Sequence, residues 1–89
     1  MSKVVIHHRA ATYVRKLPNP QKSRLKQLLK DLENKPLAHP QVRQMVGDWA
    51  GYYRLRLGDM RIIFWYETET DTIFVDYIGA RGDIYKSGD

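Results

Sequence analysis

Apolar residues recur every three or four positions in the first part of the chain, which is the spacing of one face of an α-helix. This pattern predicts a short helix over residues 9–17 and a longer helix that runs to about Asn34. The sequence Pro18-Asn19-Pro20 separates them, and we expect Asn19 to cap the second helix with Pro20 in its first turn. The apolar stripe of the second helix consists of Leu25, Leu28, Leu29 and Leu32.

From Trp49 onward apolar and polar residues alternate, and a period of two is typical of half-buried β-strands. Short polar connections join the strands of this part of the chain, which predicts an antiparallel meander. The intervening residues 35–48 are expected to form a loop or a short turn of helix. Strands are expected near residues 3–8, 50–57, 60–67 and 72–79.

Together these elements fill the chain and predict one domain over residues 1–89. We expect an α+β fold with the element order β-α-α-β-β-β. Its sheet is expected to be mainly antiparallel, with the two helices packed as a hairpin on one face.

The formal net charge is +5, from 15 basic and 10 acidic residues. Residues 1–48 carry 10 of the basic and 3 of the acidic side chains, so the surplus lies in the helical part. Such a surplus favours an anionic partner, of which nucleic acid is the commonest. The absence of cysteine excludes disulfides, thiolate metal sites and thiol nucleophiles. With no secretory signal and no apolar run of the roughly 20 residues that a membrane span needs, we expect a cytoplasmic protein that does not bind membranes.

Three arginines in the strand-forming part are the strongest candidates for chemistry. Alternate residues of a strand face opposite sides of its sheet, which places Arg54 and Arg56 together on the face away from the core. If Gly58-Asp59 forms a two-residue hairpin loop, Arg61 lies directly opposite Arg56 on that face. Like charges in this arrangement are destabilising, whereas a phosphate would relieve the repulsion and match the guanidinium forks. The pattern therefore predicts a phosphate-binding patch.

Aromatic residues accompany these arginines and suit the stacking of RNA bases. Tyr52 is expected on the same face, and Trp65 has the same parity along its strand as Arg61. On the C-terminal tail, Tyr85 and the neighbouring Lys86 are further candidates for RNA binding.

The sequence predicts no metal site and no cofactor. His7 and His8 are expected to point to opposite faces of a strand, so they cannot chelate a metal together. His39 stands alone in the loop region.

The stretch from Gly51 to Tyr85 resembles the RelE/ParE toxin superfamily, and specifically its RelE-like mRNA interferase branch. The expected order of elements matches as well, so the resemblance spans nearly the whole chain. ParE relatives, which poison DNA gyrase, share the hairpin arginine and the arginine after the last strand. The matching pieces are Tyr53-Arg54-Leu55-Arg56-Leu57, Gly58-Asp59-Met60-Arg61-Ile62-Ile63-Phe64, Ile78-Gly79-Ala80-Arg81 and Ile84-Tyr85.

The resemblance implies the toxin of a type II toxin–antitoxin system, an endoribonuclease that cuts messenger RNA on the ribosome without a metal. In such enzymes the ribose 2′-OH attacks the adjacent phosphorus and leaves a cyclic phosphate. By resemblance, Arg54 and Arg56 occupy the paired basic positions of the family, and Arg61 occupies the phosphate-binding position. Arg81 matches the residue thought to protonate or stabilise the leaving oxygen. Tyr85 matches the C-terminal tyrosine that orients or stacks the substrate.

The family often has lysines where this chain has Arg54 and Arg56. Deprotonating a guanidinium at pH 7 would cost about 7–8 kcal/mol, against about 5 kcal/mol for a lysine. We therefore expect Arg56 to stabilise the pentavalent phosphorane rather than act as the base. Water, a ribosomal group or Tyr85 would then take the proton. Two alternatives stay open: a ParE-like inhibitor of DNA gyrase without catalytic activity, and a non-catalytic RNA-binding relative.

The resemblance also implies a cognate antitoxin as a partner. An acidic antitoxin would suit the basic helices. We expect it to contact the helical hairpin over residues 9–34 and to block or distort the arginine face.

Overall fold

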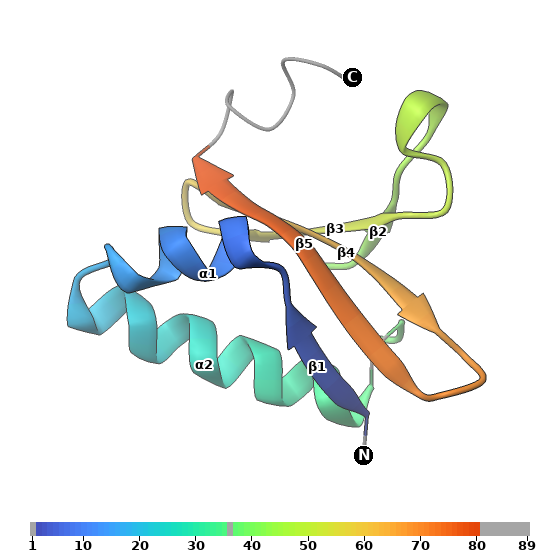
Figure 1. Cartoon of the computed structure of the whole chain (residues 1–89), viewed down its shortest axis with the longest axis horizontal. Coiled ribbons are helices and arrows are strands. Elements are labelled where there is room, and N and C mark those ends of the chain that lie inside the picture. The colour runs from blue at the N-terminus through green and yellow to red at the C-terminus, as the bar shows by residue number, and fades with distance from the viewer. Residues whose placement is uncertain (1, 36, 81–89) are drawn as a thin grey trace.

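Two helices cover one face of a five-stranded sheet in the computed structural model, which describes residues 2–35 and 37–80 (Figure 1). The strand order across the sheet is β1-β5-β4-β3-β2. The elements are β1 (Lys3–Ile6), α1 (His8–Arg15), α2 (Asn19–Asn34), β2 (Arg43–Gln44), the short 3₁₀ helix η1 (Gly47–Trp49), β3 (Tyr53–Leu57), β4 (Met60–Glu67) and β5 (Thr72–Ala80).

Strands β3, β4 and β5 form the expected antiparallel meander, and β1 lies parallel to β5 at one edge. The α+β fold with a helical hairpin on one face is therefore confirmed. Strand β2 was not predicted, because residues 35–48 were expected to form a loop or a turn of helix. It pairs with β3 through two residues only, Arg43 with Arg54 and Gln44 with Tyr53. A strand of two residues is too short to show a period in the sequence.

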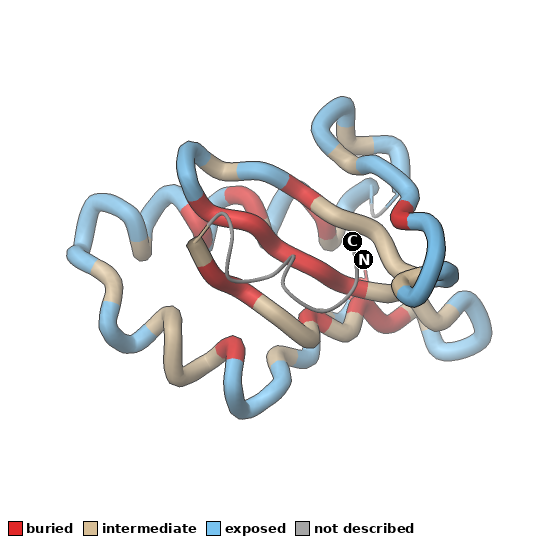
Figure 2. The backbone as a smooth tube through the Cα atoms, turned by 90° about the horizontal axis from the view of Figure 1, so that it is seen from above, coloured by how far each residue is buried: buried red, intermediate tan, exposed pale blue. Residues whose placement is uncertain are grey.

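The main core lies between the helices and the sheet, where the strands show continuous buried segments (Figure 2). The predicted stripe of α2 supplies Leu25, Leu28 and Leu32, which are buried against strand residues such as Ile62 and Phe64. Burial of each of these side chains stabilises the fold by about 1.5–3 kcal/mol. This apolar contact fixes which face of the sheet the helices cover.

A second, smaller apolar cluster lies on the opposite face of the sheet. Its buried members are Met45 and Ile63, and Trp49, Tyr52 and Tyr77 pack against them. The cluster lies over the middle of the face that the helices leave open, so this face is only partly polar.

Strand β5 contains a β-bulge, which the sequence did not predict. Phe64 pairs with Val75, and the preceding Ile63 pairs with Tyr77, so Asp76 has no partner on β4. The extra residue inverts the alternation of β5. As a result, Val75 packs in the main core while Tyr77, two residues on, packs in the smaller cluster on the other face.

Both helices begin at a different residue from the one expected. Residues His7 and His8 do not belong to β1, because His7 caps α1 by accepting a hydrogen bond from the backbone N–H of Arg9 at 3.1 Å, and His8 is the first residue of the helix. At the start of α2 the cap is Pro18, in an extended conformation, and Asn19 is already helical. Pro20 falls in the first turn as predicted, where its missing N–H would have had no partner.

Candidate functional site

The β3–β4 hairpin has the register predicted for it. Leu57 pairs with Met60 across a two-residue turn, and Gly58 in that turn adopts a φ of 60°, which glycine tolerates without strain. Arg56 then pairs with Arg61. Directly opposed residues of an antiparallel pair have Cβ atoms about 4.5–5.5 Å apart. The two arginines therefore start side by side on the same face of the sheet.

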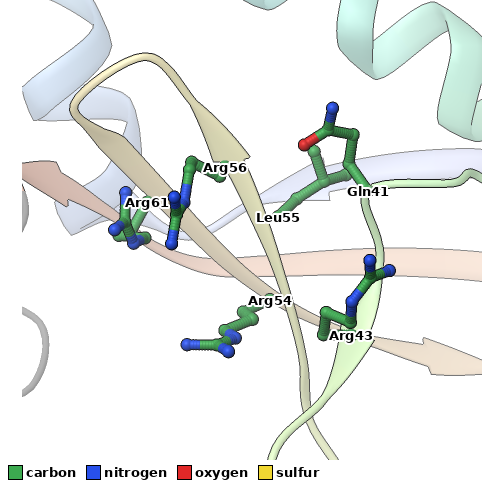
Figure 3. Close-up of a pocket in the computed structure, with 6 residues that line it drawn as sticks. All are labelled: Gln41, Arg43, Arg54, Leu55, Arg56 and Arg61. Atoms are coloured by element: carbon green, nitrogen blue, oxygen red, sulfur yellow. The ribbon is translucent and has the colours of Figure 1, made fainter.

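These arginines line a cavity of about 270 Å³ on the face that the helices leave open (Figure 3). The side chains of Arg56 and Arg61 extend next to each other from β3 and β4, and Arg54 reaches out from further along β3. The structure thus brings the three predicted arginines to one site. The residues that line the cavity are Gln41, Arg43, Arg54, Leu55, Arg56 and Arg61.

Arg61 is buried, with 3% of its surface exposed. Its Nε atom is buried and has no hydrogen-bond partner among residues 2–35 and 37–80. On its other side Arg61 pairs with Gly79, which has no side chain to occupy the neighbouring space. A buried cationic group with an unsatisfied donor costs free energy unless an anion or acceptor binds it. This residue is therefore the part of the site that most needs a ligand.

The other two predicted arginines are more accessible, since Arg54 is half-buried and Arg56 is exposed. Guanidinium groups donate hydrogen bonds in a planar fork that fits two oxygens of a phosphate. Several such groups around one cavity produce a strongly positive potential in it. The arrangement can bind a phosphodiester and stabilise extra negative charge on its non-bridging oxygens.

Two residues of the cavity, Gln41 and Arg43, were missed by the sequence analysis. Arg43 lies on the unpredicted strand β2, directly opposite Arg54. Its Nη1 donates hydrogen bonds to the backbone oxygens of Pro40, at 2.7 Å, and Val42, at 3.1 Å, which hold the guanidinium in place at the edge of the cavity. Its basic side chain was visible in the sequence, but no periodicity in residues 35–48 indicated that it would join the sheet.

Tyr52 lies on the open face as expected, in the small apolar cluster rather than in the lining of the arginine cavity. Its hydroxyl donates a hydrogen bond to Oδ2 of Asp76 at 3.0 Å, and its ring meets Trp49 edge to face at 5.4 Å. Burial raises the pKa of the Tyr52 hydroxyl, and the hydrogen bond to Asp76 raises it further.

Trp65 is stacked on Phe74, with ring centroids 4.5 Å apart and planes inclined by 15°. It is half-buried and does not line the arginine cavity. It lies four positions after Arg61 along β4, a distance of about 13 Å. Its stacking partner within the fold is thus Phe74, while a base could reach only the part of the ring that stays exposed.

The remaining predicted site residues, Arg81, Tyr85 and Lys86, lie outside the described residues. Within the part of the chain that the structure describes, no group of three or more histidine or acidic residues could hold a metal ion. No helix of that part is long and apolar enough to cross a membrane.

Solved structures with the same fold come from toxins and toxin–antitoxin complexes. The RelBE2 toxin–antitoxin complex of Mycobacterium tuberculosis contains a chain with a TM-score of 0.79 and 21% identity, over 90% of this chain and 98% of that one. The isolated RelE toxin of Escherichia coli has a TM-score of 0.75 and 20% identity, over 96% and 92% of the two chains. A YoeB/ParE toxin from Agrobacterium tumefaciens has a TM-score of 0.78 and 15% identity, over 89% and 98%. A comparison with curated protein sequences found no match.

The fold is therefore the one that these toxins share, and its open face carries an arginine-lined cavity. The sequence profile of the ParE toxin of the type II toxin–antitoxin system parDE matches residues 4–85. The chain belongs to this ParE toxin family.

Proposed function

We propose that this toxin is a metal-independent endoribonuclease that cuts messenger RNA, with the ribosome as the setting of the reaction. The observation that carries the proposal is the pair Arg56 and Arg61, held face to face across the hairpin with Arg61 buried and its Nε unsatisfied within the described chain. Stability alone gives no reason for this arrangement. A phosphodiester in the cavity supplies the missing acceptor.

The arginines of the cavity stabilise negative charge and do not transfer protons. The ribose 2′-OH attacks the adjacent phosphorus and gives its proton to water, a ribosomal group or Tyr85, which forms a pentavalent phosphorane. The 5′ oxygen then leaves and takes up a proton, which gives a 2′,3′-cyclic phosphate. Arg61 binds a phosphoryl oxygen from within the sheet, while Arg56 and Arg54 approach from the accessible side. Preorganised donors of this kind stabilise the transition state without any reorganisation of the site.

The other proposed residues bind the RNA on either side of the reacting phosphate. Arg81 is proposed to stabilise or protonate the leaving oxygen, and Tyr85 to orient the substrate. Lys86 is proposed to bind the backbone. Tyr52 and Trp65 would stack bases with their exposed ring surfaces, since their buried parts are already engaged with the protein.

The test is primer extension on translated mRNA, with and without the toxin. The proposal expects cuts within codons at the ribosomal A site, and their loss in Arg56→Ala and Arg61→Ala. Arg15→Ala is the matched control, because Arg15 is exposed on α1, away from the cavity. Full cutting by both cavity variants would overturn the proposal.

A second candidate is inhibition of DNA gyrase without catalysis, and the match to the ParE profile favours it. It predicts DNA breaks in cells whose mRNA stays intact. A third candidate, a non-catalytic RNA-binding toxin, predicts a protein that binds ribosomes and leaves A-site mRNA uncut.

The toxin is also proposed to bind a cognate antitoxin, as the RelBE2 protein does. Apolar anchors for such a partner are available on the helical hairpin. Tyr13 and Leu17 line a groove of about 110 Å³ beside the β3–β4 turn. An antitoxin segment in this groove would lie close to the hairpin that carries Arg56 and Arg61.

A further inference from the structure

One side of α2 carries three lysines in a single row. Lys22, Lys26 and Lys30 are spaced four residues apart, so they lie one above another along the helix, each about 6 Å from the next. Lys26 and Lys30 are exposed, and Lys22 is partly exposed. We call these three residues the lysine row.

The stability of the helix does not explain the lysine row. Like charges four residues apart destabilise a helix, whereas a carboxylate three or four residues away would offset the repulsion. Within α2, all of whose residues are described, only Glu33 stands at such a spacing, three residues after Lys30. The nearby carboxylate of Asp31 accepts a hydrogen bond from Gln27 instead, at 3.2 Å. The row is therefore a concentration of positive charge that the carboxylates of α2 offset at Lys30 alone.

The lysine row and the arginine cavity lie on different sides of the molecule. Helix α2 covers one face of the sheet (Figure 1), and the leucines of its stripe are buried in the main core. The cavity opens on the other face, where Ile63, two residues along β4 from Arg61, packs in the smaller cluster. A ligand of the row does not compete with a ligand of the cavity.

The residues around the row favour a nucleic-acid backbone over a protein partner. Ser23 and Gln27, which lie three residues before Lys26 and Lys30, are exposed side chains of the kind that contact phosphate and sugar. Protein interfaces are poor in lysine and rich in aromatic residues and methionine, and this side of α2 has no such anchors. Lysine is a compact charge that binds phosphates without reading sequence.

We propose that the lysine row is a second RNA-binding surface, which holds the phosphate backbone of an RNA duplex. The choice of RNA rather than DNA rests on the proposed function, because the same molecule would then serve both sites. A short single strand in the cavity cannot also reach the far side of the helical layer. The two surfaces together select a folded RNA that presents a duplex and a single strand at once, and the second contact raises the effective concentration at the first.

The test measures binding to a blunt RNA duplex of about 16 base pairs, a length that double-strand-binding domains span, by fluorescence anisotropy over a series of KCl concentrations. The variant of the row carries Lys22→Gln, Lys26→Gln and Lys30→Gln. We expect it to bind at least about tenfold more weakly at low salt, with a log–log salt slope shallower by about 2–3. The control carries Lys3→Gln, Lys16→Gln and Lys35→Gln, which remove the same charge from exposed positions in β1 and just after the ends of α1 and α2. It is expected to bind within about twofold of the wild type and to keep most of the slope.

The inference fails if the row variant keeps the wild-type slope, or if the control loses as much affinity as the row variant. It also fails if a DNA duplex of the same sequence binds more tightly through the same lysines, or if the row variant loses antitoxin binding and keeps the duplex. The row variant should melt no lower than the wild type, since it relieves like-charge repulsion. If the wild type bound the duplex through the row but cut no mRNA, the endoribonuclease proposal would fail and the lysine-row proposal would stand.

Discussion

Arg56 and Arg61 face each other across the β3–β4 hairpin as a cross-strand pair of like charges, one exposed and the other buried. Such a pair weakens the ladder in which it stands. The register is held by its neighbours, because Met60 is buried in the main core and Gly58 adopts the conformation that the tight turn requires. The hairpin therefore keeps an unfavourable contact at the place where a phosphate would make it favourable.

The first prediction concerns the cost of this contact. Arg56→Gln should raise the free energy of unfolding by about 0.2–1 kcal/mol, because it removes the repulsion across the ladder, and should abolish mRNA cutting. Urea denaturation and primer extension measure the two effects. Arg15→Gln, on the exposed side of α1, should leave the stability within about 0.5 kcal/mol of the wild type and should keep the cutting activity. A less stable Arg56→Gln protein would contradict the argument.

The second prediction concerns the buried guanidinium. Arg61→Met should be more stable than the wild type by about 1 kcal/mol. The substitution replaces a buried guanidinium, whose Nε has no hydrogen-bond partner among residues 2–35 and 37–80, by an apolar side chain of similar length. An uncleavable 2′-O-methyl RNA should raise the melting temperature of the wild type, by the equivalent of about 2.7 kcal/mol at a concentration of 100 Kd. The same RNA should raise the melting temperature of Arg61→Met much less. Arg61→Lys keeps the charge but lacks the planar guanidinium. If RNA raised the melting temperature of this variant as much as that of the wild type, the guanidinium would not be binding two phosphate oxygens at once.

The hairpin register was predictable from the sequence, because a two-residue Gly58-Asp59 turn and strict alternation leave few alternatives. Strand β2 was not predictable, and with it Arg43 was missed as part of the cavity. Its two residues join the sheet through backbone pairing with β3. Residues 35–48 show no alternation of apolar and polar positions that would indicate a strand. The bulge at Asp76 was invisible for a similar reason, since the apolar residues that flank it read as one continuous strand.

The third prediction separates the hydroxyl of Tyr52 from its ring. Tyr52→Phe should lower the free energy of unfolding by about 1 kcal/mol, because Asp76 loses the hydrogen bond at 3.0 Å. RNA affinity should not change, since this hydroxyl donates to Asp76 and the ring remains. In Asp76→Asn the pKa of Tyr52 should fall towards its ordinary value, because a charged neighbour that raises it is gone. Urea denaturation, RNA titration and a spectroscopic pH titration of the tyrosine give these values, and a loss of RNA affinity in Tyr52→Phe would contradict the assignment.

The fourth prediction is a pH dependence at the β4–β5 turn. Oδ1 of Asp71 accepts hydrogen bonds from the Ser2 hydroxyl at 2.6 Å and the Tyr66 hydroxyl at 2.5 Å, and these bonds lower the pKa of Asp71 below 3.8. A group with a lowered pKa stabilises the folded state fully above its unfolded pKa, and this contribution is lost as the pH falls through the folded value. Stability should therefore fall on acidification below about pH 4.

Asp71→Asn should show a shallower loss of stability over that acid range, measured by urea denaturation at a series of pH values. Asparagine tolerates the positive φ of 51° at this position, so the backbone of the turn is preserved. Asp59→Asn, in the exposed β3–β4 turn, is the control and should follow the wild-type curve. Equal acid slopes for Asp71→Asn and the wild type would show that these hydrogen bonds do not contribute to the dependence.

The shortness of β2 also bears on how the toxin behaves at high concentration. The outermost strand of a sheet offers unpaired backbone groups to other chains, and long flat edges of this kind cause aggregation. Strand β2 offers only Arg43 and Gln44 at this edge, and the positive charge of Arg43 repels a second copy that carries the same residue. Thus the residue at the rim of the cavity also discourages self-association along this edge, which keeps the site open to other molecules.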